Sequence, residues 1–147
     1  MHYFKLCTIY IMSMLYIVVG IKHFTDPDFF VHIVPPFLIY REEMVYLSGL
    51  VEIVMGLFLL FNKTRKIGSW GIIALLIAVF PANIYLYLSE SAREVLQISQ
   101  NQALIRMPFQ LPLLILAYWH SQESSSKKFS IICSVLFVPT IVYFLSL

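Results

Sequence analysis

Seven polar side chains interrupt or border the apolar runs of this chain, and these residues could do chemistry: Lys22, His23, Ser48, Glu52, Asn83, Arg106 and Gln110. Ionisable groups are unfavourable inside a bilayer, so they usually face a bundle interior, pair with one another or mark a ligand or ion pathway. Amide and hydroxyl groups beside them add hydrogen-bonding capacity. We therefore take the seven residues as one candidate ligand-binding cluster.

Glu52 and Arg106 are the charged pair that this cluster predicts. A lone carboxylate in hydrocarbon tends to protonate, and an arginine at similar depth would keep it ionised. At a rise of about 1.5 Å per residue, Glu52 lies roughly 12 Å into its run, and Asn83 lies roughly 8 Å from the end of its own. Ser48 shares a helix face with Glu52, as Gln110 does with Arg106, because each pair is spaced i, i+4. All of them fall in one half of the membrane.

The same residues also have a purely structural interpretation. Intramembrane polar groups join helices to one another without any ligand, and a Glu52–Arg106 pair could serve only to specify the fold. The sequence contains no metal-ligand spacing, nucleophile elbow or phosphate-binding loop, so it predicts no metal site and leaves open whether any reaction is catalysed. Cys7 and Cys133 lie far apart in apolar runs, and we interpret them as packing residues.

The composition indicates that membrane-embedded elements hold these residues in place. Hydrophobic residues make up 60% of the 147 positions and charged residues 12%, whereas a soluble domain is about 25% charged. The mean hydropathy is +0.83. A chain of this length cannot bury so much apolar surface in water, so we predict an integral membrane protein. A net charge of +2, with no basic run that carries aromatics, argues against nucleic acid as a partner.

Five apolar runs approach the length of about 20 residues that a spanning helix needs. We predict an all-α, polytopic helix bundle whose spans are residues 6–21, 44–61, 67–88, 103–119 and 129–147. The fourth run is the weakest, because Arg106 interrupts its start. Residues 121–128 form a polar linker, so we expect a four-helix core over residues 1–120 and an added helix within residues 121–147.

Lysine and arginine in the short loops set the orientation. The side of the amino terminus carries six of them, namely Lys5, Lys63, Arg65, Lys66, Lys127 and Lys128, and the other side carries four, namely Lys22, Arg41, Arg93 and Arg106. We therefore expect a cytoplasmic amino terminus and an outside carboxyl terminus in a plasma membrane of the bacterial inner-membrane type. The candidate cluster then lies in the outer half.

The first outer loop, residues 22–43, contains a mostly apolar segment at residues 29–40. The segment is too short to span, and Pro35-Pro36 prevents a continuous helix. We expect it to lie in the membrane interface or to fold back over the bundle as a lid.

Five motifs carry a resemblance to a known family. They are Gly20-Ile21-Lys22-His23-Phe24 with Pro27 and Phe30, then Pro35-Pro36, the stretch Tyr46-Leu47-Ser48-Gly49-Leu50-Val51-Glu52-Ile53-Val54-Met55-Gly56, Phe80-Pro81-Ala82-Asn83, and Arg106-Met107-Pro108-Phe109-Gln110. In order and spacing they resemble DoxX-like integral membrane proteins over roughly residues 10–120. The resemblance implies a four-helix core, and some relatives are subunits of quinone-linked membrane redox complexes.

Two functions follow as expectations. The first is an accessory of a membrane redox system that binds a quinone or another lipid-soluble molecule in an outer-half polar pocket, with a redox protein or a second copy as partner. The second is a non-catalytic chaperone or assembly partner whose polar cluster is structural. A lipid-accessible cavity at the cluster would favour the first function, and a tightly packed ion pair would favour the second. A transporter fits less well, because the sequence shows no inverted repeat.

Overall fold

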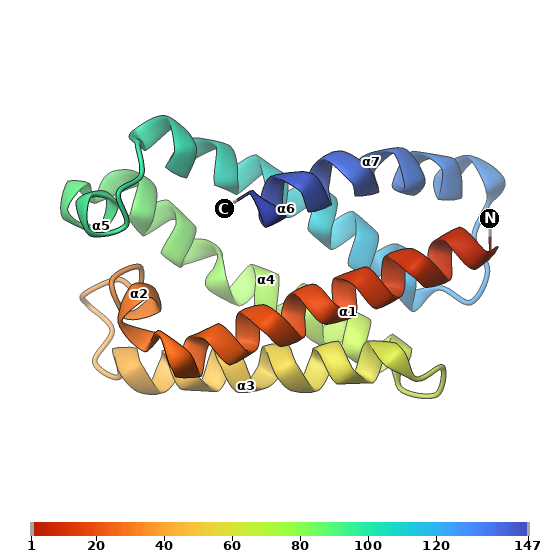
Figure 1. The fold of residues 1–147 in the computed structure, drawn as a ribbon, viewed down its shortest axis with the longest axis horizontal. Coiled ribbons are helices and arrows are strands. Elements are labelled where there is room, and N and C mark those ends of the chain that lie inside the picture. Colours follow the sequence, from red (N-terminus) through yellow and green to blue (C-terminus); the bar gives the residue numbers. More distant parts are fainter. Residues whose placement is uncertain (1, 147) are drawn as a thin grey trace.

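Five long helices and two short ones make up the part of the chain that the structure, a computed structural model, describes, residues 2–146. The long helices are α1 (His2–Thr25), α3 (Arg41–Leu60), α4 (Arg65–Leu88), α6 (Gln100–Ser121) and α7 (Lys127–Leu145). The short helices are α2 (Pro27–Val31) and α5 (Glu90–Val95), and both lie at one end of the bundle (Figure 1). No strand occurs within these residues, which confirms the all-α prediction.

Four of the long helices are long and apolar enough to cross a membrane. They are α1 from Tyr3 onward, α3, α4 and α7. The fourth predicted run became α6, which is not among them, because its amino-terminal half carries several amides and Arg106. A membrane protein with four candidate spans is thus what the fold supports, and a fifth crossing by α6 stays a prediction.

Capping residues fix the first residues of helices whose ends the hydropathy pattern gives only approximately. Ser99 accepts a hydrogen bond from the Gln102 backbone, and the Gln102 side chain accepts one from the Ser99 backbone, a reciprocal cap that starts α6 at Gln100. Ser126 caps α7 through the Phe129 backbone in the simpler form. The short helix α5, capped by Ser89, was not predicted.

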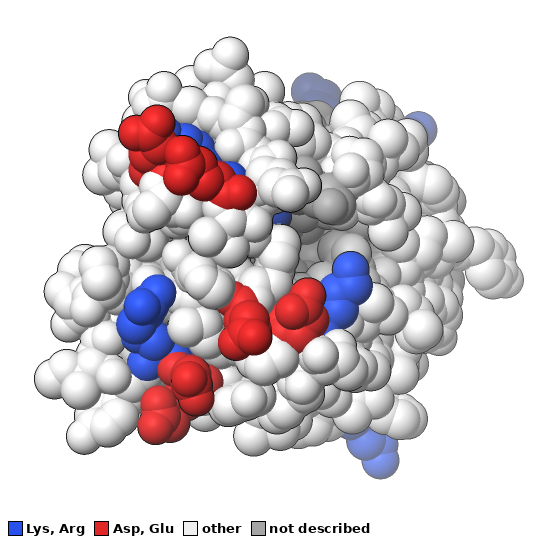
Figure 2. Space-filling view, turned by 60° about the vertical axis from the view of Figure 1, so that its left-hand side comes forward, with Lys and Arg blue, Asp and Glu red and all other residues white. Residues whose placement is uncertain are grey.

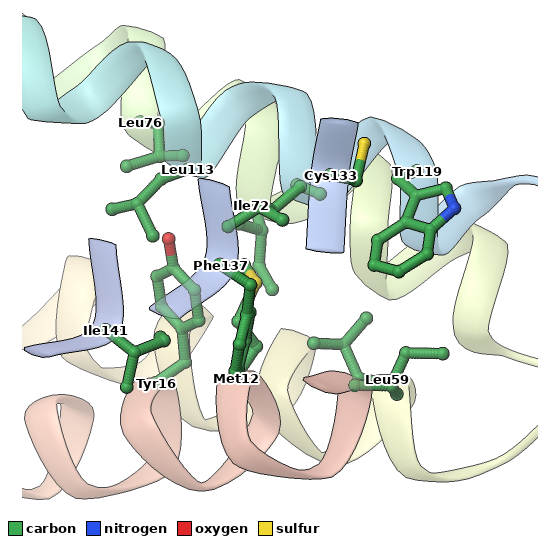
Figure 3. Close-up of a cluster of buried hydrophobic side chains, with 13 residues drawn as sticks. Met12, Tyr16, Leu59, Ile72, Leu76, Leu113, Trp119, Cys133, Phe137 and Ile141 are labelled. Atoms are coloured by element: carbon green, nitrogen blue, oxygen red, sulfur yellow. The ribbon is translucent and has the colours of Figure 1, made fainter. Parts of the chain in front are cut away.

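The long helices pack as neighbouring antiparallel pairs, α1 beside α3 and α4 beside α6, with α7 against α6 (Figure 1). One buried apolar cluster joins all five, and Figure 3 shows Met12, Leu59, Ile72 and Phe137 converging within it. Since α7 contributes side chains such as Phe137 to this core, it packs as part of the bundle. The expected division at residue 120 stays a prediction.

Glycines bring α1 and α3 into backbone contact. A Cβ added to Gly49 would lie 2.5 Å from the His23 Cβ and 2.9 Å from the Gly20 carbonyl oxygen. A Cβ at Gly56 would lie 2.9 Å from the Ile17 side chain. Small residues permit such approaches between membrane helices. Gly49 and Gly56 lie one turn before and one turn after Glu52 in α3, and the helix that they admit is α1.

The segment of residues 29–40 folds partly back over the end of the bundle. The Phe30 ring stacks on His23, with ring centroids 3.6 Å apart, and Ile33 packs against the small core of Leu86, Ala92 and Ala103 where α4, α5 and α6 meet. Farther along, Phe37 is 77% exposed. The segment thus covers the bundle end with its first half, as a lid would, and presents apolar side chains outward with its second half.

Candidate functional site

Glu52 of α3 pairs with His23 of α1. The His23 Nδ1 atom lies 3.3 Å from the Glu52 Oε2 atom, and both residues are more than 90% buried, with exposed fractions of 6% and 8%. His23 Nδ1 also lies 2.9 Å from the Val19 carbonyl oxygen, one turn earlier in α1. The Phe30 ring stacks on the His23 ring and so covers the pair. The Gly20 and Gly49 contacts hold the two helices close enough for this pairing.

The predicted Glu52–Arg106 pair is wrong. Among residues 2–146, the Glu52 carboxylate contacts His23, and Arg106 forms no ion pair. Arg106 is instead half-buried near the phenol of Tyr143 in α7. The Phe109 ring, almost one turn farther along α6, stacks on Tyr143 with centroids 4.0 Å apart. The pairing of α1 with α3 and of α6 with α7 therefore gives the two charged residues different neighbours.

Asn83 and Gln110 form the second half of the predicted cluster, between α4 and α6. Asn83 Nδ2 donates to Gln110 Oε1 at 3.1 Å, and Gln110 Nε2 donates to the Leu76 carbonyl at 3.0 Å. Pro81 lies inside α4 and has no N–H for the carbonyl of Ile77. Gln110 thus supplies a hydrogen bond to α4 immediately beside the point where proline interrupts its ladder.

The cluster is therefore divided in two, and Lys22 and Ser48 join neither half. Lys22 is exposed at the end of α1. Ser48 donates to the Val45 carbonyl of its own helix at 2.9 Å. The expected grouping of seven residues becomes a packed His23–Glu52 pair and a separate Asn83–Gln110 pair, and within residues 2–146 Arg106 forms no ion pair or hydrogen bond with either.

A groove of about 370 Å³ runs along α4 and α6 beside the second pair. Its walls come from Leu76, Ile77 and Phe80 of α4 and from Met107, Pro108, Gln110, Leu111 and Leu114 of α6. Gln110 is the polar residue in this set. Ile77 is 62% exposed and Leu111 is 61% exposed, so the groove opens on an apolar outer face that acyl chains would cover in a membrane.

Charges separate between the two ends of the bundle. Six exposed carboxylates lie at the end that bears α2 and α5, on Asp26, Asp28, Glu42, Glu43, Glu90 and Glu94. Figure 2 shows acidic side chains grouped on this end. The opposite end carries Lys5, Lys63, Arg65, Lys66, Lys127 and Lys128. The two faces therefore differ in charge as the loop sequences predict, while the orientation in a membrane stays a prediction.

A family model described as a domain of unknown function (DUF8561) matches residues 12–121. The chain belongs to this family. The resemblance to DoxX-like proteins is therefore wrong, and the expectation of a DoxX-like core is withdrawn with it. The short motifs that suggested it consist largely of Gly, Pro and apolar residues, which recur wherever membrane helices pack closely. No curated protein matches the chain, and no solved structure matches it.

The DUF8561 segment contains all seven predicted cluster residues and ends with α6. It leaves out α7 and nearly three turns at the start of α1. Sequence reasoning missed one polar group near the end of this segment, His120, which is 2% exposed and lies 3.0 Å from the Thr8 hydroxyl. Its position directly after Trp119, at the edge of an apolar run, was the available signal.

Proposed function

We propose that the protein binds a lipid-soluble small molecule carrying a carbonyl oxygen, of the quinone type, in the groove between α4 and α6. The observation that carries the proposal is the position of the Gln110 amide in the wall of an otherwise apolar groove. Small-molecule sites are typically cavities of about 300–1,000 Å³ with apolar walls and a few placed polar groups. The volume of about 370 Å³ falls in this range.

Gln110 retains hydrogen-bonding capacity after its contacts within the protein are counted. A primary amide has two N–H donors and an oxygen with two lone pairs. One donor goes to the Leu76 carbonyl, and the oxygen accepts one hydrogen bond from Asn83. The remaining N–H can donate to a ligand carbonyl. Asn83 and Leu76 fix the amide in place, so a ligand would meet a preorganised donor.

The test is photolabelling with an azido-benzoquinone of the protein in phosphatidylcholine nanodiscs, with attachment sites mapped by mass spectrometry. We expect labelling at groove residues of α4 and α6, suppressed by excess decylbenzoquinone. Ile77→Trp should fill the groove and so abolish the labelling. Ile84→Trp is the matched control, because Ile84 is an exposed residue of the same helix, at 39% exposure, that does not line the groove. Labelling spread evenly over the lipid-facing surface, or unaffected by Ile77→Trp, would refute the proposal.

A structural role for the other half of the cluster is the second candidate. The His23–Glu52 pair is enclosed by glycine contacts and by Phe30, and a packed pair of this kind joins two helices without a ligand. This observation favours a chaperone or assembly partner in which α1 and α3 form a rigid unit. Co-purification of one stoichiometric membrane protein, with no effect of Ile77→Trp on it, would support that role over the groove.

The expectation of a role in a membrane redox system depended on the resemblance to DoxX-like proteins, which the family match overturns.

A further inference from the structure

A second pocket, which is polar, lies at the opposite end of the bundle from α2 and α5, where α1 and α4 begin and α6 ends. Its volume is about 280 Å³. Three cationic residues line it, Lys5, Arg65 and Lys66, against one carboxylate, Glu123. Glu123 is exposed to solvent. The pocket, which we call the basic-end pocket, therefore carries excess positive charge and favours an anion.

Two buried nitrogen atoms at this pocket have no hydrogen-bond partner within the described residues. They are Nη2 of Arg65 and Nδ1 of His120. The Nε of Arg65 donates to the Leu59 carbonyl at 3.0 Å, which fixes the guanidinium. Lys5 Nζ donates to the Gln122 carbonyl at 2.7 Å and lies 5.3 Å from the Trp119 ring centroid. Buried polar atoms are nearly always partnered, so these two nitrogens, which belong to residues that line the pocket, each lack a polar partner that a ligand can supply.

The Thr8 hydroxyl links His120 to Lys5. This hydroxyl has one hydrogen and two neighbours within hydrogen-bond distance, the Lys5 carbonyl at 2.8 Å and His120 Nε2 at 3.0 Å. When the hydrogen is directed to the Lys5 carbonyl, the nearer of the two, the imidazole is the donor at Nε2. Burial beside the cations Lys5 and Arg65 favours a neutral ring. His120 Nδ1 is then an unprotonated acceptor, and it requires a donor from the ligand.

We propose that the basic-end pocket binds a phosphate group whose anionic oxygens face Lys5, Arg65 and Lys66 and whose own or neighbouring hydroxyl donates to His120 Nδ1. Inorganic phosphate meets both requirements, and so does the headgroup of phosphatidylglycerol. The pocket lies at the ends of apolar helices, at the level where headgroups meet the membrane, and basic pockets between membrane helices are known to hold anionic headgroups. This site does not depend on the function proposed for the groove.

The first test is calorimetric titration of the protein in phosphatidylcholine nanodiscs with inorganic phosphate and with sulfate near neutral pH. Sulfate has the same shape but no proton to donate, so it leaves His120 Nδ1 unpaired. We expect sulfate to bind about tenfold or more weakly, the usual effect of one lost buried hydrogen bond. Equal binding of the two anions would overturn the assignment of His120.

The second test uses charge variants with a matched control. Lys66→Gln removes an exposed pocket charge that makes no hydrogen bond within residues 2–146, so folding should be retained. Arg65→Lys keeps the charge but removes Nη2. Each should weaken phosphate binding about tenfold, as expected for one charge-assisted hydrogen bond. Lys63→Gln removes an equal charge from the loop just before α4, outside the pocket, and should change binding less than twofold. An equal effect of all three would reduce the site to diffuse surface charge and contradict the proposal.

The third test identifies the source of the phosphate. Native mass spectrometry after mild delipidation counts the phosphatidylglycerol molecules retained by the wild type and by Lys66→Gln. Retention of one lipid that Lys66→Gln loses assigns the site to a headgroup. Calorimetric binding of inorganic phosphate without lipid retention assigns it to a soluble phosphate, and both together show that the phosphate group itself is recognised. If the protein neither retains the lipid nor binds inorganic phosphate, the proposal is overturned.

Discussion

His23 Nδ1 lies 3.3 Å from the Glu52 carboxylate, and this contact joins α1 to α3 beside Gly20 and Gly49, where the two backbones approach closely. Removing one partner of a buried polar contact typically costs about 1–3 kcal/mol, because the other group is left without that partner. We therefore expect the effects of substitutions at His23 and at Glu52 on the free energy of unfolding to be coupled to each other.

A double-mutant cycle tests this pair. Glu52→Gln and His23→Gln should each lower the free energy of unfolding in detergent, and the double variant should lose less than the sum by about 1–3 kcal/mol. The matched cycle replaces His23→Gln with Arg106→Gln, and there the losses should add, because Arg106 does not contact Glu52. Coupling in the Arg106 cycle and additivity in the His23 cycle would restore the pairing inferred from the sequence alone.

Gly49→Ala should separate α1 from α3. The added Cβ would lie 2.5 Å from the His23 Cβ and 2.9 Å from a backbone oxygen, and overpacking of this kind typically costs about 1–3 kcal/mol. Gly71→Ala is the control, since its Cβ would meet chiefly the thioether of Met55, a flexible side chain that can move aside. Chemical unfolding in detergent measures both variants, and equal stability of the two would contradict the close approach at Gly49.

Gln110→Leu should destabilise the α4–α6 pair more than Asn83→Leu does. The first change removes two hydrogen bonds, the one from Asn83 Nδ2 and the one to the Leu76 carbonyl, whereas the second removes only the bond between Asn83 and Gln110. Each lost hydrogen bond costs about 0.5–1.5 kcal/mol. Asn101→Leu, at an exposed position of α6, serves as the control in the same unfolding assay. A larger loss for Asn83→Leu would show that Gln110 does not support the proline-interrupted helix.

Phe30→Ala should loosen the cover over the His23–Glu52 pair. The ring stacks on His23 at 3.6 Å, and an aromatic contact of this kind contributes about 0.5–1.5 kcal/mol beyond its burial. Phe37→Ala removes an equal ring that is 77% exposed, so it should leave the melting temperature unchanged. Faster amide exchange in α2 of Phe30→Ala, and not of Phe37→Ala, would confirm that the first half of the segment acts as a lid.

The charge separation predicts which end of the bundle faces the cytoplasm. In a background of Cys7→Ser and Cys133→Ala, Lys63→Cys should react with an impermeant maleimide only after cells are permeabilised, because basic loops stay inside. Glu90→Cys, on the exposed acidic end, should react in intact cells. The reverse pattern would invert the topology, and it would leave the fold and both pockets unchanged.

The sequence by itself determined where the long helices lie in the chain and that they are apolar enough for a membrane. Hydrophobic runs predicted every long helix, because the length of a span and the exclusion of charge follow directly from the properties of the bilayer. Pro35-Pro36 and the short apolar segment predicted a loop that lies in the membrane interface or folds back over the bundle. The reciprocal cap of Ser99 and Gln102 was also readable in the sequence, and it would have placed the start of α6 correctly.

Only the tertiary structure decided which polar groups meet. Depth along a helix follows from residue counting, but the partner of Glu52 depends on the rotation of α3 about its axis and on which helix lies against that face. Both are set by side-chain packing, here by Gly20 against Gly49, and packing is not encoded in the spacing of charges. For the same reason His120 was missed, because its partners Thr8 and Lys5 lie at the far end of the chain and meet it only when α1 packs beside the end of α6.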